Sequence, residues 1–139
     1  MTTLEEKWGS DALAFGWTAL PISLLTHQRK LGLNPVGLNV LLHLLSQWWQ
    51  REKLPYPSQA SIAEKVGVST RTVQREIVLM KKNGLLKITR TSIHDEKFLG
   101  RNLYDLSPLV AKLQKLSAEL LIEQEIKNKR PKSGKPATP

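Results

Sequence analysis

The middle of the chain alternates short amphipathic runs with single glycines and helix-capping residues. In the segment ASIAEKVGVSTRTVQREI, residues 60–77, apolar side chains recur at helical spacing on both sides of Gly67. Ser58 and Ser69 are of a residue type that caps the N-terminus of a helix. The pattern predicts two helices that meet at a tight turn, residues 59–66 and 69–83.

A more apolar helix is predicted before this pair. Asn34 and Pro35 form an N-cap and first-turn pair, and the apolar residues after them fall on one helical face, which we expect in the core. This stripe comprises Leu38, Leu41, Leu42, Leu45, Trp48 and Trp49. A short helix from near Pro21 to Gly32 is expected upstream. A strand or linker is expected at 54–57, because residues that precede proline avoid the helical region.

Two short strands are predicted after the helix pair. The segment LLKITRTS, residues 85–92, has the β-branched content and rough alternation of a strand, and LGRNLYDL, residues 99–106, offers the return strand. Together they would make a two-stranded wing. We therefore expect a mainly α fold with a small β-wing in one domain, residues 16–106, followed by a C-terminal helix.

The segments before and after this domain are not predicted to be part of its core. Residues 1–15 show no clear periodicity and are expected to form a flexible arm, and the basic residues 128–139 a disordered tail. In the last helix, residues 107–127, leucines alternate by three and four as in a coiled-coil seam, so we expect a homodimer. The alternative is that this helix folds back on its own domain. The seam residues are Leu109, Leu113, Leu116 and Leu120.

Charge and composition narrow the class of partner. The net charge is +9, and the excess lies on the predicted helix pair and on the C-terminal tail, which points to a polyanionic partner. The absence of cysteine excludes disulfides, and three scattered histidines argue against a metal site. No catalytic motif, apolar span or secretory signal is found, so we expect a cytoplasmic protein without enzyme activity, cofactor, membrane association or small-molecule effector.

The exposed face of the predicted helix 69–83 carries side chains suited to reading DNA. Val73, Ile77 and Met80 share the buried stripe, which turns a basic and amide-bearing face outward. Arginine can bind guanine, glutamine can bind adenine, and an apolar side chain can touch a thymine methyl. On this face lie Arg71, Gln74, Arg75 and Val78, which we expect to contact bases, and Lys82, which we expect to contact the backbone. Further residues suited to phosphate contacts are Gln59, Thr70 and Thr72.

From Gly16 to Leu106 the chain resembles the winged helix-turn-helix domains of phage and plasmid replication initiators and related small bacterial regulators. The matching segments are GWTALPISLL, YPSQASIAEKVGVSTRTVQREIVLMKKNGLL and GRNLYDL. The resemblance implies binding to double-stranded DNA in a bacterial nucleoid. It implies base contacts from Thr70, Arg71, Gln74 and Arg75, and backbone contacts from Gln59, Ser69 and the wing residues Arg90, Lys97 and Arg101.

Three functions follow from these observations. The first is a dimeric transcriptional regulator that binds specific duplex sequences, the second is a plasmid or phage replication initiator or accessory factor, and the third is a protein-interaction module on a helix-turn-helix scaffold. Trp48 and Trp49 also allow two interpretations. They could form a stacking platform for single-stranded nucleic acid, but their place at the end of an apolar stripe favours core packing, with room for one ring to be partly exposed.

Overall fold

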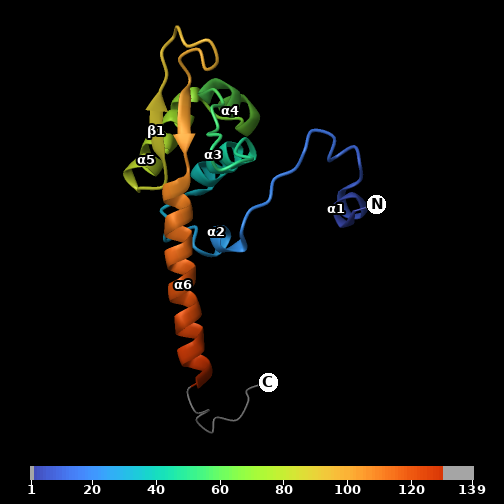
Figure 1. Ribbon diagram of the computed structural model, residues 1–139, viewed down its shortest axis with the longest axis vertical. Helices are drawn as coiled ribbons and strands as arrows, with labels where there is room; N and C mark the ends of the chain where they lie inside the picture. The colour runs from blue at the N-terminus through green and yellow to red at the C-terminus, as the bar shows by residue number, and fades with distance from the viewer. Residues whose placement is uncertain (1, 130–139) are drawn as a thin grey trace.

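The computed structural model describes residues 2–129, which form six helices and one antiparallel two-stranded sheet. The elements are α1 (Thr3–Trp8), α2 (Ile22–Thr26), α3 (Pro35–Ser46), α4 (Gln59–Val66), α5 (Thr70–Lys82), β1 (Lys87–Arg90), β2 (Asn102–Asp105) and α6 (Ser107–Lys129). Helices α3, α4 and α5 lie together beside the hairpin, and α6 runs away from them as a long rod (Figure 1). A mainly helical fold with a small hairpin and a C-terminal helix is therefore confirmed.

The turn between α4 and α5 forms because its residues cap both helices. The Ser58 hydroxyl accepts a hydrogen bond from the Ser61 N–H at 3.1 Å, and the Ser69 hydroxyl accepts one from the Thr72 N–H at 3.1 Å. Gly67 ends α4 with φ at 83°, a left-handed conformation that glycine adopts without strain. The predicted bounds of both helices are confirmed to within one residue.

Helix α3 approaches α5 at Gly37, beside a side-chain bond between Asn34 and Glu76. Asn34 caps α3 by accepting a hydrogen bond from the Gly37 N–H at 2.7 Å, and its amide donates to both carboxylate oxygens of Glu76 on α5 at 3.2 and 3.1 Å. A Cβ atom on residue 37 would lie 2.9 Å from a Glu76 oxygen, closer than real Cβ contacts come. A side chain at residue 37 would therefore displace the Glu76 carboxylate from the bond by which Asn34 joins the two helices.

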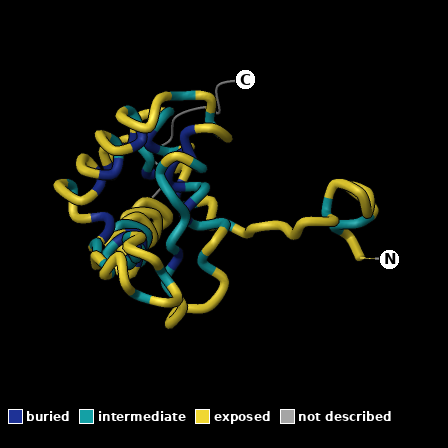
Figure 2. Tube along the Cα trace, turned by 90° about the horizontal axis from the view of Figure 1, so that it is seen from above, coloured by how far each residue is buried: buried dark blue, intermediate teal, exposed yellow. Residues whose placement is uncertain are grey.

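One apolar core fills the space between α3, α4, α5, the hairpin and the start of α6. Figure 2 shows the buried segments turned toward the middle of this body. The buried apolar residues are Leu24, Leu31, Leu33, Val40, Leu41, Leu44, Ile62, Ala63, Val73, Ile77, Met80, Leu85, Leu86, Tyr104, Leu106, Leu109 and Leu113. The stripe predicted for α5 is confirmed in this set. On α3 the buried face is centred on Val40, Leu41 and Leu44, and the predicted Leu38, Leu42 and Leu45 are only partly buried.

Helix α3 ends before its two tryptophans, which corrects their predicted place on the apolar stripe. The Ser46 hydroxyl donates to the His43 carbonyl at 2.7 Å, and the Trp48 N–H donates to the Leu45 carbonyl at 3.0 Å, so local bonds satisfy the last turn. Trp48 packs partly against the core. Trp49 is 80% exposed, which is more than the one partly exposed ring that the prediction of core packing allowed.

The hairpin pairs β1 with β2 in antiparallel register, with Lys87 opposite Asp105 and Ile88 opposite Tyr104. Tyr104 is buried, and its N–H donates to the Pro55 carbonyl at 3.0 Å. This bond places the segment 54–57 beside β2. The segment forms no strand, so the linker interpretation holds for it.

Helix α6 is buried at its start and exposed along the rest of its length. Leu109 and Leu113 belong to the core of their own domain, Leu116 packs partly against that core, and Leu120 is 36% exposed. This corrects the predicted continuous seam, because Leu109 and Leu113 cannot also face a second chain. The helix also includes Asn128 and Lys129, which were expected in the disordered tail. The remainder of that predicted tail, 130–139, lies outside the described residues.

The N-terminal arm contains a helix that the sequence pattern did not predict. Thr2 and Glu5 cap α1 reciprocally, the side chain of each accepting a bond from the backbone N–H of the other at 3.2 and 3.3 Å. The arm leads away from the body (Figure 1). Downstream, α2 covers only Ile22–Thr26, shorter than predicted, and turns follow it. Among the described helices, none has the length and hydropathy needed to span a bilayer.

Candidate nucleic-acid interface

The outward face of α5 carries the side chains that the sequence predicted to contact bases. The helix is held by Val73, Ile77 and Met80, which are at most 2% exposed and point into the core. The opposite face is therefore open along the whole helix. Its exposed residues are Thr70, Arg71, Gln74, Arg75, Val78 and Lys82, with Val78 58% exposed.

The only acid of α5 is turned away from this face. Glu76 accepts two hydrogen bonds from the Asn34 side chain at the start of α3, and it is half-buried there. Its negative charge thus lies on the α3 side of the helix. Arg71, Arg75 and Lys82 remain as the charged groups on the outward face, a distribution that attracts phosphates.

The residues predicted to contact the DNA backbone from the helix pair are partly engaged inside the protein. The hydroxyls of Ser69 and Thr72 lie 2.9 Å apart and share a hydrogen bond at the start of α5. The amide of Gln59 donates to the Tyr104 hydroxyl at 3.4 Å and is half-buried. These bonds hold Ser69 and Thr72 at the start of α5 and Gln59 at the start of α4, and both Ser69 and Thr70 are exposed.

The loop between β1 and β2 has exposed basic side chains. One of its acidic side chains is hydrogen-bonded to the backbone of the loop itself. Arg90, Lys97 and Arg101 are all exposed, as expected for wing residues. The Asp95 carboxylate accepts hydrogen bonds from the N–H groups of Lys97 and Phe98 at 2.9 and 2.8 Å. This acid therefore shapes the turn of the loop.

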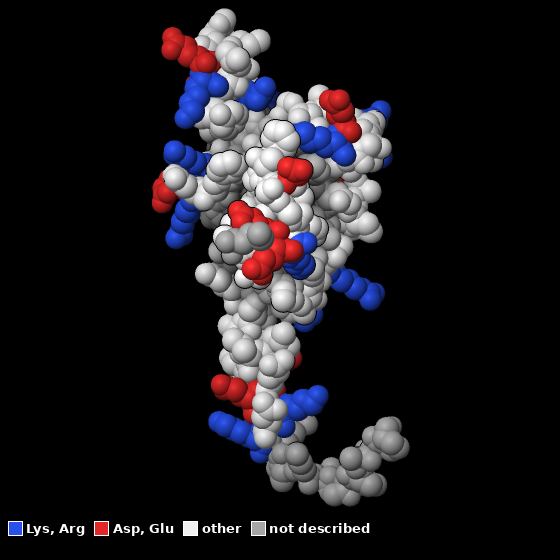
Figure 3. Space-filling view, turned by 90° about the vertical axis from the view of Figure 1, so that its right-hand side faces the viewer, with Lys and Arg blue, Asp and Glu red and all other residues white. Residues whose placement is uncertain are grey.

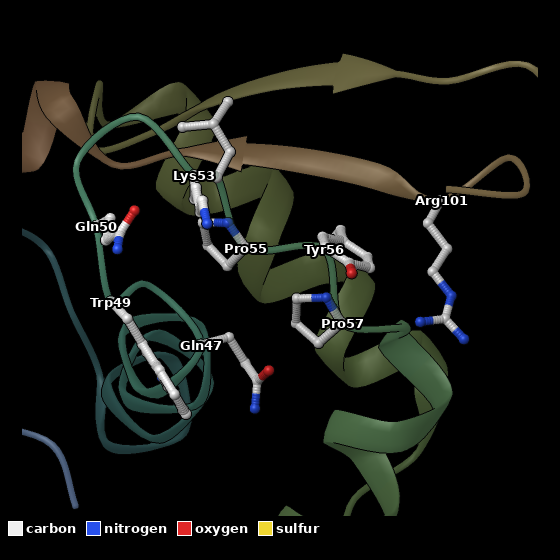
Figure 4. Close-up of a pocket in the computed structure, with 9 residues that line it drawn as sticks. Gln47, Trp49, Gln50, Lys53, Pro55, Tyr56, Pro57 and Arg101 are labelled. Carbon is white, nitrogen blue, oxygen red and sulfur yellow. The ribbon is translucent and has the colours of Figure 1, made fainter. Parts of the chain in front are cut away.

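A second candidate surface, which sequence reasoning did not favour, lies where the loop after α3 meets the hairpin. A pocket of about 500 Å³ opens there, and we call it the Trp49 pocket. Figure 4 shows Trp49 at one side, Arg101 at the other and the proline-bearing segment between them. Its lining residues are Gln47, Trp49, Gln50, Lys53, Leu54, Pro55, Tyr56, Pro57 and Arg101. The one sequence signal for it was the tryptophan pair.

Histidines and acids form no cluster suited to a metal ion among residues 2–129. His43 is half-buried, and this burial lowers its pKa below the usual 6.5, with a smaller effect from the positive charge of Lys65. Within the described range, no three His, Asp or Glu side chains come together as metal ligands would.

On the side of the molecule that carries the N-terminal arm, acidic and basic side chains are mixed (Figure 3).

Comparison with known proteins identifies the domain. No curated protein shows a significant match to the chain. The crystal structure of the N-terminal domain of DnaD protein from Geobacillus kaustophilus HTA426 has a similar fold, with a TM-score of 0.61 and 26% sequence identity, over 90% of this chain and 98% of that chain. The family model of the DnaD N-terminal domain matches residues 20–127, from just before α2 into the last turns of α6. The chain therefore belongs to the DnaD N-terminal domain family.

Proposed function

We propose that this chain is a winged helix-turn-helix domain that binds specific sequences of duplex DNA and works in DNA replication. The observation that carries the proposal is the outward face of α5, where Arg71, Gln74 and Arg75 are exposed and the only acid of the helix is bonded to α3. In this proposal α5 enters the major groove, and the hairpin is the wing that contacts the backbone beside it.

The rigidity of α5 supports direct base readout. The helix is capped by Ser69, anchored in the core by three apolar residues, and joined to α3 through Glu76. A side chain on such a helix keeps its position relative to the neighbouring contacts, which base-specific hydrogen bonds require. The domain would act by binding alone, without catalysis.

The family favours the replication alternative over the transcriptional regulator, because the DnaD N-terminal domain is a replication-related domain. We therefore place the function with a bacterial replication protein acting on DNA in the cytoplasm. Selection of bound sequences from random duplexes separates the alternatives. Iterated direct repeats near an origin fit replication, palindromes upstream of a promoter fit regulation, and absence of any bound duplex leaves the protein-interaction module.

The direct test is substitution on the outward face of α5. Arg71→Ala and Arg75→Ala should each weaken binding to a selected duplex by about 1–3 kcal/mol and relax the base preference at one position. Arg29→Ala is the matched control, since Arg29 is an exposed arginine in the turns after α2. If both α5 variants bind the selected duplex with the affinity and selectivity of the Arg29 variant, α5 is not the recognition helix.

We propose further that the outer half of α6 joins two copies of the chain. Beyond the core this helix exposes Leu120, Leu121, Ile122 and Ile126, apolar side chains that a soluble monomer would leave in water. A double substitution Leu121→Glu and Ile122→Glu should convert a dimer into a monomer, as measured by mass in solution. A wild-type chain that sediments as a monomer at all concentrations would remove this part of the proposal.

A further inference from the structure

We propose that the Trp49 pocket stacks an unpaired base of single-stranded DNA. This inference goes beyond the duplex-binding function proposed above, because it concerns a different form of DNA and a pocket that shares only Arg101 with the proposed duplex interface. It rests on three properties of the pocket: an exposed ring held in place, a stiff floor and a positive rim.

The Trp49 ring is exposed but fixed. Its indole N–H donates a hydrogen bond to the Ser46 carbonyl, one of the last carbonyls of α3, while the side chain remains 80% exposed. It lines the Trp49 pocket and also a second hollow of about 400 Å³ on the α6 side. Burial in the core therefore does not explain this tryptophan. A fixed open ring loses little side-chain entropy when a base stacks on it.

The floor of the pocket is held by neighbouring contacts. Pro55 is buried, and its carbonyl accepts the bond from the Tyr104 N–H on β2. The Tyr56 ring packs edge-to-face on Phe98 of the wing loop, with ring centroids 4.9 Å apart and planes at 77°. The two prolines restrict the backbone on both sides of Tyr56. The pocket is thus formed before any ligand arrives.

The rim of the pocket is positive. Lys53 and Arg101 line it from two different segments, and its lining set contains no Asp or Glu. Glu52, the acid next to Lys53 in the sequence, is exposed and does not line the pocket. Aromatic rings flanked by cations are the combination that proteins use to hold single-stranded nucleic acid, since bases stack on the rings while cations attract the phosphates.

The shape of the pocket favours an unpaired base over a duplex. Its volume lies in the range of about 300–1,000 Å³ that is usual for small-molecule sites, which accommodates a flat heterocycle. A base within a duplex is stacked and paired, so it cannot enter such a site without leaving the helix. Arg101, at the hairpin side of the pocket, would then contact the phosphate next to the bound base.

The test measures binding of a fluorescently labelled oligothymidylate by anisotropy, with a duplex of mixed sequence measured in parallel. Trp49→Ala should weaken oligothymidylate binding about tenfold, the usual effect of losing one stacked base, and leave duplex binding unchanged. Trp49→Phe should restore most of the affinity because a phenyl ring still stacks. Trp8→Ala is the matched control, because Trp8 is an exposed tryptophan of α1 in the arm.

The cations provide a second, independent measurement. Arg101→Ala and Lys53→Ala should each flatten the dependence of oligothymidylate affinity on salt concentration, because each removes one phosphate contact. The proposal is overturned if the wild-type chain does not bind oligothymidylate, or if Trp49→Ala binds it as tightly as Trp8→Ala. Failure of the α5 proposal would look different, since Arg71→Ala would then leave duplex binding unchanged while the Trp49 dependence persisted.

Discussion

Helices α5 and α6 carry similar apolar spacing in the sequence but have different environments in the structure. On α5, Val73, Ile77 and Met80 are buried from the first turn to the last. On α6, only Leu109 and Leu113 are buried, although the spacing continues to Leu120. Periodicity therefore indicates which face of a helix is apolar, whereas the extent of the neighbouring elements decides how much of that face is covered.

The difference follows from what lies beside each helix. Helix α5 has α3 and α4 packed along it, and its outward polar face is left to solvent or to a ligand. Helix α6 begins directly after β2, and its first turns close the core before it runs past the body (Figure 1). Its outer half thus has apolar side chains that residues 2–129 leave exposed, which motivates the proposed dimer.

The largest expected effect comes from truncating buried leucines and isoleucines. Ile77→Ala on α5 and Leu109→Ala on α6 should each lower the free energy of unfolding by about 2–5 kcal/mol, because both leave a cavity in the same core. Leu121→Ala, on the exposed part of α6, should change it by less than about 0.5 kcal/mol in dilute protein. Chemical denaturation measures all three. Equal losses from Leu109→Ala and Leu121→Ala would show that the outer half is also packed.

A smaller effect is expected at the cap of α5. Ser69→Ala removes the hydroxyl that accepts the Thr72 N–H, so the free energy of unfolding should fall by about 1 kcal/mol. Ser69→Asp keeps an acceptor at the N-terminus and should recover most of the loss. If Ser69→Ala unfolds with the wild-type midpoint in denaturant, the cap does not contribute to stability.

The parts of the fold that sequence could predict are those set by local bonds. Asn34, Ser58, Ser69 and Gly67 each cap or end a helix through bonds within a few residues. The start of α3 and both ends of α4 and α5 were accordingly predicted to within one residue. The basic outward face of α5 could also be predicted from periodicity alone. The hydrogen bond that holds Glu76 toward α3 could not be predicted, because its partner Asn34 is 42 residues away in the sequence.

The parts that were missed depend on where a helix stops or on what lies beyond it. The apolar pattern of α3 extends through Trp49 in the sequence, but the helix ends at Ser46 and the Trp49 side chain is exposed. The Trp49 pocket also includes Arg101, which the sequence predicts as a wing residue but not as a neighbour of Trp49. Likewise, the short α1 relies on a reciprocal cap of Thr2 and Glu5 that periodicity does not reveal.

A third prediction changes the charge of α5 without changing its packing. Glu76→Gln keeps an oxygen that can accept a hydrogen bond from Asn34 but removes the only negative charge of the helix. Duplex binding at low salt should strengthen by less than about 1 kcal/mol, and stability should change little. The measurement is duplex affinity as a function of salt. Unchanged or weaker binding at low salt would mean that the duplex does not approach this helix.

The smallest effect on stability is expected at the start of α6, where the charge of the Asp105 carboxylate depends on pH. The Asp105 carboxylate accepts the Ser107 N–H at 2.9 Å, and this bond, aided by the Ser107 side chain and weakly by Lys87, lowers the pKa of Asp105 below its usual 3.8. A lowered pKa means that the ionised group stabilises the folded state above pH 3.8 and that this contribution is lost as the pH falls below that value. Asp105→Asn should therefore unfold at a lower temperature than the wild type near neutral pH, and the two melting temperatures should converge well below pH 3.8. A constant difference across this range would show that the carboxylate charge does not hold the first turn of α6 onto the domain.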